Sequence, residues 1–75
     1  MTDQLIATIV DVKSGSWKWG IRCEVRVHRA DVDPKGRGYR DRCEAVYGDL
    51  NRRHTGPRSE FGQLLQRLRE EGVLV

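Results

Sequence analysis

The chain has few of the large apolar residues that build a deep hydrophobic core. Its 75 residues include one phenylalanine, two tyrosines, two tryptophans and one methionine, and hydrophobic residues make up only 37% of the total. A chain of this length buries about 60–65% of its unfolded surface, which leaves no room for a second core or a deep active-site cleft. We therefore expect residues 1–75 to form a single small domain with a thin core.

Long apolar runs are also missing. No segment approaches the ~18 consecutive apolar residues of a membrane-spanning helix. Near the N-terminus, Asp3 stands where a secretory signal would carry basic residues, and no small-residue cleavage site follows. The sequence thus predicts a cytoplasmic protein without a membrane partner.

Cysteine is scarce, and the two cysteines lie far apart in the sequence. Cys23 and Cys43 belong to no CxxC motif, and His28 and His54 do not have the HxxxH spacing that zinc sites use. We expect both cysteines to be reduced thiols buried as small apolar side chains, in preference to a disulfide between them. The sequence predicts no metal site.

The sequence pattern does not bring together the groups that catalysis needs. General acid–base chemistry requires two carboxylates, or a carboxylate and a histidine, that converge in a shielded cleft. Asp31 and Asp33 lie in a segment with proline and glycine, and Glu70 and Glu71 lie near the end of an expected helix. Residues 35–38 are too short for a phosphate loop of the nucleotide-binding type. We predict a non-enzymatic protein without a cofactor.

What the sequence does contain is a run of alternating apolar residues. Every second residue from 17 to 27 is apolar: Trp17, Trp19, Ile21, Cys23, Val25 and Val27. This period-2 pattern is typical of a β-strand with one face in the core. Residues 4–13 form another apolar segment, and the intervening Ser14-Gly15-Ser16 is typical of a turn. The pattern predicts an antiparallel β-hairpin with strands at about 4–13 and 17–29.

The expected turn also predicts the register of the hairpin. A loop of two or four residues centred on Ser14 and Gly15 pairs Ile6 with Cys23, which places Ile6 and Val10 on the apolar face. On the outer face it leaves three apolar residues beside the basic ones: Leu5, Ala7 and Ile9. Such a mixed face favours an interface, including a homodimer through this face, unless the tail or residues 30–38 cover it.

Two further segments have helical spacing. Apolar residues at i, i+4, i+7, i+8 and i+11 predict a helix over about 39–53: Tyr39, Cys43, Val46, Tyr47 and Leu50. Apolar residues at i, i+3, i+4 and i+7 predict a second helix over about 57–71: Phe61, Leu64, Leu65 and Leu68. Pro57 suits the first helical position, and Gly72 suits the residue after the helix.

The order of these elements predicts an α+β fold. In this fold the hairpin is covered on one face by the two helices. Residues 73–75 are apolar and β-prone, and they form either a short third strand or a tail that packs on the core.

Basic residues are concentrated in two parts of the chain, although the net charge is only +3. Residues 34–40 contain three cations and residues 50–59 contain three arginines, in both cases without an acid. A localised basic surface attracts nucleic acid, whereas isolated arginines also serve as solvated surface residues. The candidate contacts on these segments and on the outer face are Lys18, Arg22, Arg26, Lys35, Arg37, Arg40, Arg52, Arg53 and Arg58.

The aromatic pair at the loop end of the hairpin has two interpretations. A buried Trp17 or Trp19 would complete the core, whereas an exposed one would be an aromatic anchor for a base or a protein partner. We predict a binding module that acts on nucleic acid or a nucleoprotein complex through its basic surface. The alternative is a small inhibitor or regulator of the phage or mobile-element type that binds a host protein complex.

Overall fold

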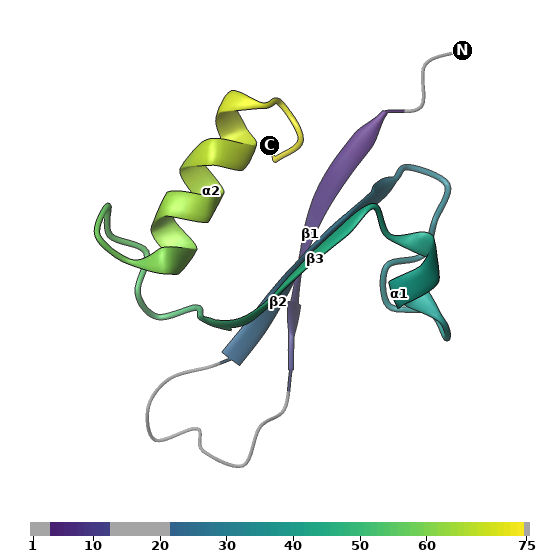
Figure 1. Cartoon of the computed structure of the whole chain (residues 1–75), viewed down its shortest axis with the longest axis horizontal. Coiled ribbons are helices and arrows are strands. Elements are labelled where there is room, and N and C mark those ends of the chain that lie inside the picture. Colours follow the sequence, from purple (N-terminus) through teal and green to yellow (C-terminus); the bar gives the residue numbers. More distant parts are fainter. Residues whose placement is uncertain (1–3, 13–21, 75) are drawn as a thin grey trace.

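The computed structural model describes residues 4–12 and 22–74, and these residues form an α+β fold (Figure 1). Along the chain, the described elements are β1 (Leu5–Asp11), β2 (Arg22–Arg29), α1 (Tyr39–Arg42), β3 (Ala45–Asn51) and α2 (Glu60–Glu70). The three strands make one antiparallel sheet in the order β1-β2-β3. The α+β class predicted from the sequence is confirmed.

The predicted hairpin is present in the described residues as β1 and β2. These strands are adjacent and antiparallel, and Val12 continues the pairing by donating its N–H to the Arg22 carbonyl at 2.9 Å. Residues 17–21, which the prediction included in the second strand, lie outside the described residues.

The predicted register of this hairpin is wrong. Ile6 pairs with His28 instead of Cys23, and Asp11 pairs with Cys23. The shift is an odd number of residues, and it therefore exchanges the two faces of β1. Three residues expected on the outer face now pack on the core: Leu5, Ala7 and Ile9. The reason is that β1 is apolar on both faces, so its own pattern does not select a register.

The predicted helix over 39–53 is also wrong. Only residues 39–42 are helical, as α1, and the chain then forms the edge strand β3. Cys23 pairs with Leu50 while Val25 pairs with Tyr47, so two residues of β3 oppose Glu24 in a β-bulge. The bulge puts Tyr47 and Leu50 on the same face although they are three residues apart. The bulge therefore gives β3 an i, i+3 spacing of apolar residues, which is also typical of a helix.

The second predicted helix is confirmed as α2, with a later start than expected. Ser59 is its N-cap, and the Ser59 hydroxyl accepts a hydrogen bond from the Gly62 N–H at 2.9 Å. Pro57 therefore precedes the helix. At the other end, Gly72 has a φ of 79°, and Val73 donates its N–H to the Leu68 carbonyl at 3.0 Å. These contacts are those of a Schellman motif, the ending for which Gly72 was predicted.

The chain after α2 packs against the sheet without forming a strand. Val73 accepts a hydrogen bond from the Ala7 N–H at 2.7 Å, which places it at the free edge of β1. Val73 and Leu74 are partly buried against the core, and Val75 lies outside the described residues. The predicted third strand at 73–75 is absent from the described part, and the third strand of the sheet is β3.

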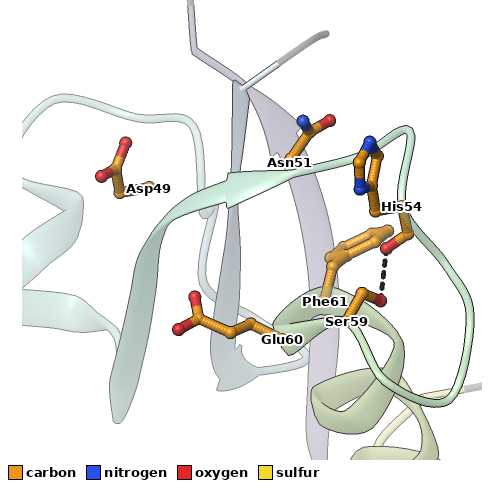
Figure 2. Close-up of a pocket in the computed structure, with 6 residues that line it drawn as sticks. All are labelled: Asp49, Asn51, His54, Ser59, Glu60 and Phe61. Atoms are coloured by element: carbon orange, nitrogen blue, oxygen red, sulfur yellow. Dashed lines mark hydrogen bonds between the residues drawn. The ribbon is translucent and has the colours of Figure 1, made fainter. Parts of the chain in front are cut away.

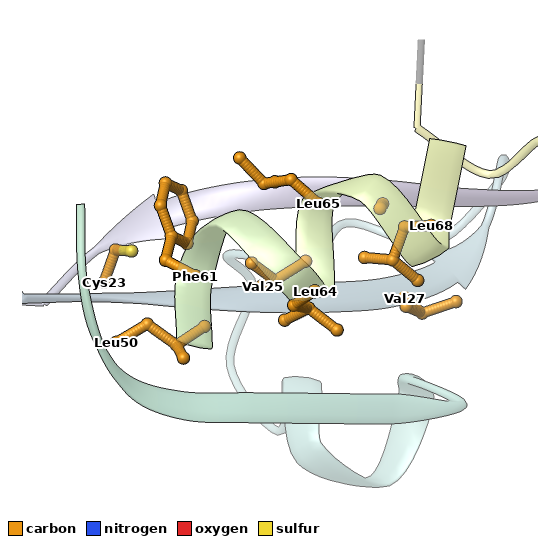
Figure 3. Close-up of a cluster of buried hydrophobic side chains, with 9 residues drawn as sticks. Cys23, Val25, Val27, Leu50, Phe61, Leu64, Leu65 and Leu68 are labelled. Carbon is orange, nitrogen blue, oxygen red and sulfur yellow. The ribbon is translucent and has the colours of Figure 1, made fainter. Parts of the chain in front are cut away.

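The core lies between α2 and one face of the sheet, which we call the core face (Figure 3). The side chains that fill it include Cys23, Val25 and Val27 of β2, Leu50 of β3, and Phe61, Leu64, Leu65 and Leu68 of α2. The opposite, polar face carries Glu24, Arg26 and His28 of β2, and α1 lies on that side (Figures 1 and 3). The two helices therefore lie on opposite faces, where the sequence predicted both on one.

Candidate functional site

The predicted binding residues separate into several groups in the structure. Trp17, Lys18 and Trp19 lie outside the described residues, so the aromatic anchor and the Lys18 contact stay predictions. The other predicted residues lie at three places: the polar face of β2, the segment around α1, and the connection between β3 and α2.

Arg26 lies on the polar face, but its side chain is only 8% exposed. Its Nε and Nη2 atoms donate to the same Glu24 carboxylate oxygen at 3.0 and 2.6 Å, and its Nη1 atom donates to the Pro34 carbonyl at 2.7 Å. The guanidinium also stacks on the Tyr39 ring, 3.5 Å from the ring centroid. Its hydrogen-bonding groups are therefore directed into the protein in this structure.

Glu24 is the acidic centre of this arrangement. Its carboxylate accepts hydrogen bonds from Arg26, from the Tyr39 hydroxyl at 3.1 Å and from Arg40 at 3.4 Å. Burial would raise the pKa of the Glu24 carboxyl, but the hydrogen bonds from Arg26 and Tyr39 and the nearby positive charges outweigh it. The pKa of Glu24 therefore lies below its usual value, and the group is a carboxylate at neutral pH. The sequence pattern did not predict a role for Glu24.

One strongly basic, exposed part of the described chain is the cationic loop, which we define as residues 35–42 and which includes the short helix α1. It contains four cations and one acid: Lys35, Arg37, Arg40, Arg42 and Asp41. Lys35, Arg37 and Arg42 are exposed and make no ion pair with the described residues, while the Arg40 side chain is 68% exposed. Arg42 was not among the predicted contacts, because the acid-free basic segment identified in the sequence ends at Arg40, before Asp41.

The second basic segment is the β3–α2 loop, residues 52–58. Arg52 is held by Asp11, with Nη1 at 2.6 Å from both carboxylate oxygens. Arg53 and Arg58 are exposed and form no ion pair within the described part of the chain. Arg22, the remaining predicted contact, pairs with Asp49. Two of the predicted cations at this end of the sheet are thus neutralised by carboxylates, and two are not.

A hydroxyl–imidazole contact on the polar face was not predicted. The Thr8 hydroxyl lies 2.7 Å from His28 Nε2, and His28 Nδ1 lies 2.8 Å from the Arg29 carbonyl oxygen. A hydroxyl beside an imidazole resembles the nucleophile and the general base of a catalytic pair. His28 is only 4% exposed, however, so the contact serves to join β1 to β2 inside the protein.

An open pocket of about 220 Å³ lies between the end of β3 and the start of α2 (Figure 2). Its lining residues are Asp49, Asn51, His54, Ser59, Glu60 and Phe61. Asp49 is paired with Arg22, and the Ser59 hydroxyl donates to the His54 carbonyl at 2.6 Å while capping α2. These two groups therefore already have structural roles.

The remaining reactive groups have ordinary surroundings. Cys23 and Cys43 are free thiols, and burial raises the pKa of the Cys23 thiol. Within residues 4–12 and 22–74, no three His, Cys, Asp or Glu side chains gather closely enough to hold a metal ion. Of the helices that the structure describes, none is long and apolar enough to cross a membrane.

A comparison of the chain with protein-family models, with curated proteins and with solved structures finds no match.

Proposed function

We propose that this protein is a non-enzymatic module that binds nucleic acid by phosphate contacts from the cationic loop. The observation that supports this proposal is the charge of the loop. Three of its exposed cations, Lys35, Arg37 and Arg42, make no ion pair with the described residues, and Asp41 is the only acid among residues 35–42. Unpaired lysines and arginines on one exposed segment form the electrostatic footprint that attracts a phosphate backbone.

The β3–α2 loop provides a second contact in this proposal. Arg53 and Arg58 are exposed at the opposite end of β3 from the cationic loop. The seven residues of β3 span about 23 Å at ~3.3 Å per residue. Contacts this far apart require a strand or duplex of several nucleotides rather than a single nucleotide. Phosphate contacts carry no base information, so we expect weak sequence preference.

The test is a salt titration of binding to a duplex and to a single strand. We expect a dissociation constant on the order of 10⁻⁶–10⁻⁴ M near physiological salt, with affinity that falls linearly on a log–log plot against salt. Arg37→Ala removes one phosphate contact, so its slope for duplex DNA should be smaller than the wild-type slope by ~0.9.

The matched control is Arg69→Ala, which removes the same charge from the exposed side of α2. It should leave the salt slope unchanged, because Arg69 does not belong to the cationic loop. Absence of binding to both nucleic acids at low salt would overturn the proposal. Equal slopes for the two variants would show that the loop is not the contact.

A further inference from the structure

The cationic loop is attached to the sheet through buried groups. Just before it, the Pro34 carbonyl accepts a hydrogen bond from Arg26. Within it, Tyr39 lies over the Arg26 guanidinium and donates its hydroxyl to Glu24. Lys35 and Arg37 lie between these two attachment points in the sequence. We call the group formed by Glu24, Arg26 and Tyr39 the buried anchor.

The anchor needs the particular shape of an arginine. The guanidinium of Arg26 makes three kinds of contact at once: paired bonds to Glu24, a bond to the Pro34 carbonyl and a cation–π contact with the Tyr39 ring. A lysine at this position would keep the charge, but its compact ammonium lacks both the planar fork and the stacking surface. Replacement of Arg26 by lysine therefore changes the geometry of the anchor while it keeps the positive charge.

We propose that the buried anchor positions the cationic loop for nucleic-acid binding, and that Arg26 and Tyr39 are positioning residues without contact to the nucleic acid. This inference rests on the proposed function. A segment with Gly36 and Gly38 has many conformations when it is free, and binding would have to select one of them. The anchor makes this selection when the protein folds, because the sheet and the loop then share one buried network.

The experiment compares Arg26→Lys with the wild-type protein in the same salt titration. Both proteins have the same net charge and the same cations on the loop. If the unanchored loop holds its binding position about a tenth of the time, the apparent affinity falls about tenfold. The salt slope should stay unchanged, since the same phosphates are contacted once the complex has formed.

A second pair of variants changes the anchor from the loop side. Tyr39→Leu removes both the stacking ring and the hydroxyl, whereas Tyr39→Phe keeps the ring over Arg26. We expect a larger loss of affinity for Tyr39→Leu than for Tyr39→Phe, with equal slopes. If Arg26→Lys does not fold, the comparison of Tyr39→Leu with Tyr39→Phe tests whether the anchor positions the loop.

The outcomes separate the two proposals. If the wild-type protein binds and Arg37→Ala lowers the slope, but the folded anchor variants bind as tightly as the wild type, the anchor proposal is overturned and the proposed function stands. A lower salt slope in Arg26→Lys would also overturn it, because Arg26 would then contact phosphate itself. If the wild-type protein does not bind nucleic acid, both proposals are wrong.

Discussion

Glu24 and Arg26 point to the same side of β2 and are both almost completely buried. Burying an ion pair costs desolvation energy that its attraction recovers only with good geometry and additional hydrogen bonds. Here the additional bonds come from the Tyr39 hydroxyl and the Pro34 carbonyl. Within the described residues, no buried side-chain nitrogen or oxygen lacks a hydrogen-bond partner. The pair therefore contributes to the position of residues 34–40 more than to the net stability.

The Glu24 carboxylate makes part of the stability depend on pH. Its pKa is lower in the folded protein than in the unfolded chain, so its stabilisation is complete above the ordinary glutamate pKa of about 4.3. The contribution is lost as the pH falls through the lower pKa of the folded state. We expect Glu24→Gln to be less stable than the wild type at pH 7, with a difference that shrinks at acid pH.

Urea unfolding of both proteins between pH 7 and pH 2.5 measures this difference. A difference in unfolding free energy that does not change with pH would contradict the assignment, because the glutamine variant has no group to titrate at this position.

At the scale of elements, β3 and α2 show how local and tertiary preferences interact. The bulge in β3 lies at Gly48 and Asp49, where Asp49 has a φ of 59° in the left-handed region. Asparagine and aspartate tolerate this region better than most residues. The bulge also twists an exposed edge strand, which disfavours edge-to-edge pairing with another chain. We therefore do not regard the edge of β3 as a binding surface.

Gly62 is a helical glycine whose replacement should destabilise the protein. Alanine normally stabilises a helix by about 1 kcal/mol relative to glycine. At Gly62, however, a Cβ atom would lie only 2.6 Å from the Thr55 carbonyl oxygen and still closer to the Gly56 carbonyl oxygen. The β3–α2 loop must then move away from the helix. We expect Gly62→Ala to lower the unfolding free energy by about 1–3 kcal/mol.

Chemical denaturation of Gly62→Ala and of Gln66→Ala tests this expectation. Gln66 is exposed on the same helix, so its replacement should change the unfolding free energy by no more than ~0.5 kcal/mol. Stabilisation by Gly62→Ala would show that the loop does not pack against the start of α2.

At the scale of the whole molecule, the hydrophobic core is one layer thick. It is formed by α2, the core face of the sheet and part of the tail, while the polar face is held by hydrogen bonds and ion pairs. A chain of this size has an unfolding free energy on the order of 5–10 kcal/mol. Because few side chains contribute to this free energy, replacement of a single core residue should lower it substantially.

Leu68 is 1% exposed and belongs to the core, where it lies beside Val27 (Figure 3). Leu68→Ala should lower the unfolding free energy by about 2–5 kcal/mol, because the cavity left behind cannot close fully. Val12→Ala is the control, since Val12 is 38% exposed and should change stability much less. Comparable losses for the two variants in thermal or urea unfolding would contradict this description of the core.

The extent to which the site was predictable differs between its residues. Basic composition pointed to Lys35, Arg37 and Arg40, which are exposed in the structure. The same reasoning chose Arg26, which is buried, and omitted Arg42, which is exposed. The sequence shows which residues are charged, but whether a charged side chain on a strand is buried depends on which other segment of the chain covers it. The contact between residues 34–40 and the polar face of β2 is such a long-range arrangement.

The local features of this protein are determined by its sequence. The apolar alternation of β2 at Cys23, Val25 and Val27, the amphipathic pattern of α2 and the glycine ending at Gly72 each act over a few residues. Within the described residues, these three features occur as predicted. The register of β1, the bulge of β3 and the burial of Arg26 were decided by the tertiary structure. The physical reason is that β1 is apolar on both faces, and that the spacing of apolar residues in β3 fits both a helix and a strand with a bulge. For such segments, only packing against α2 and the rest of the sheet selects one arrangement.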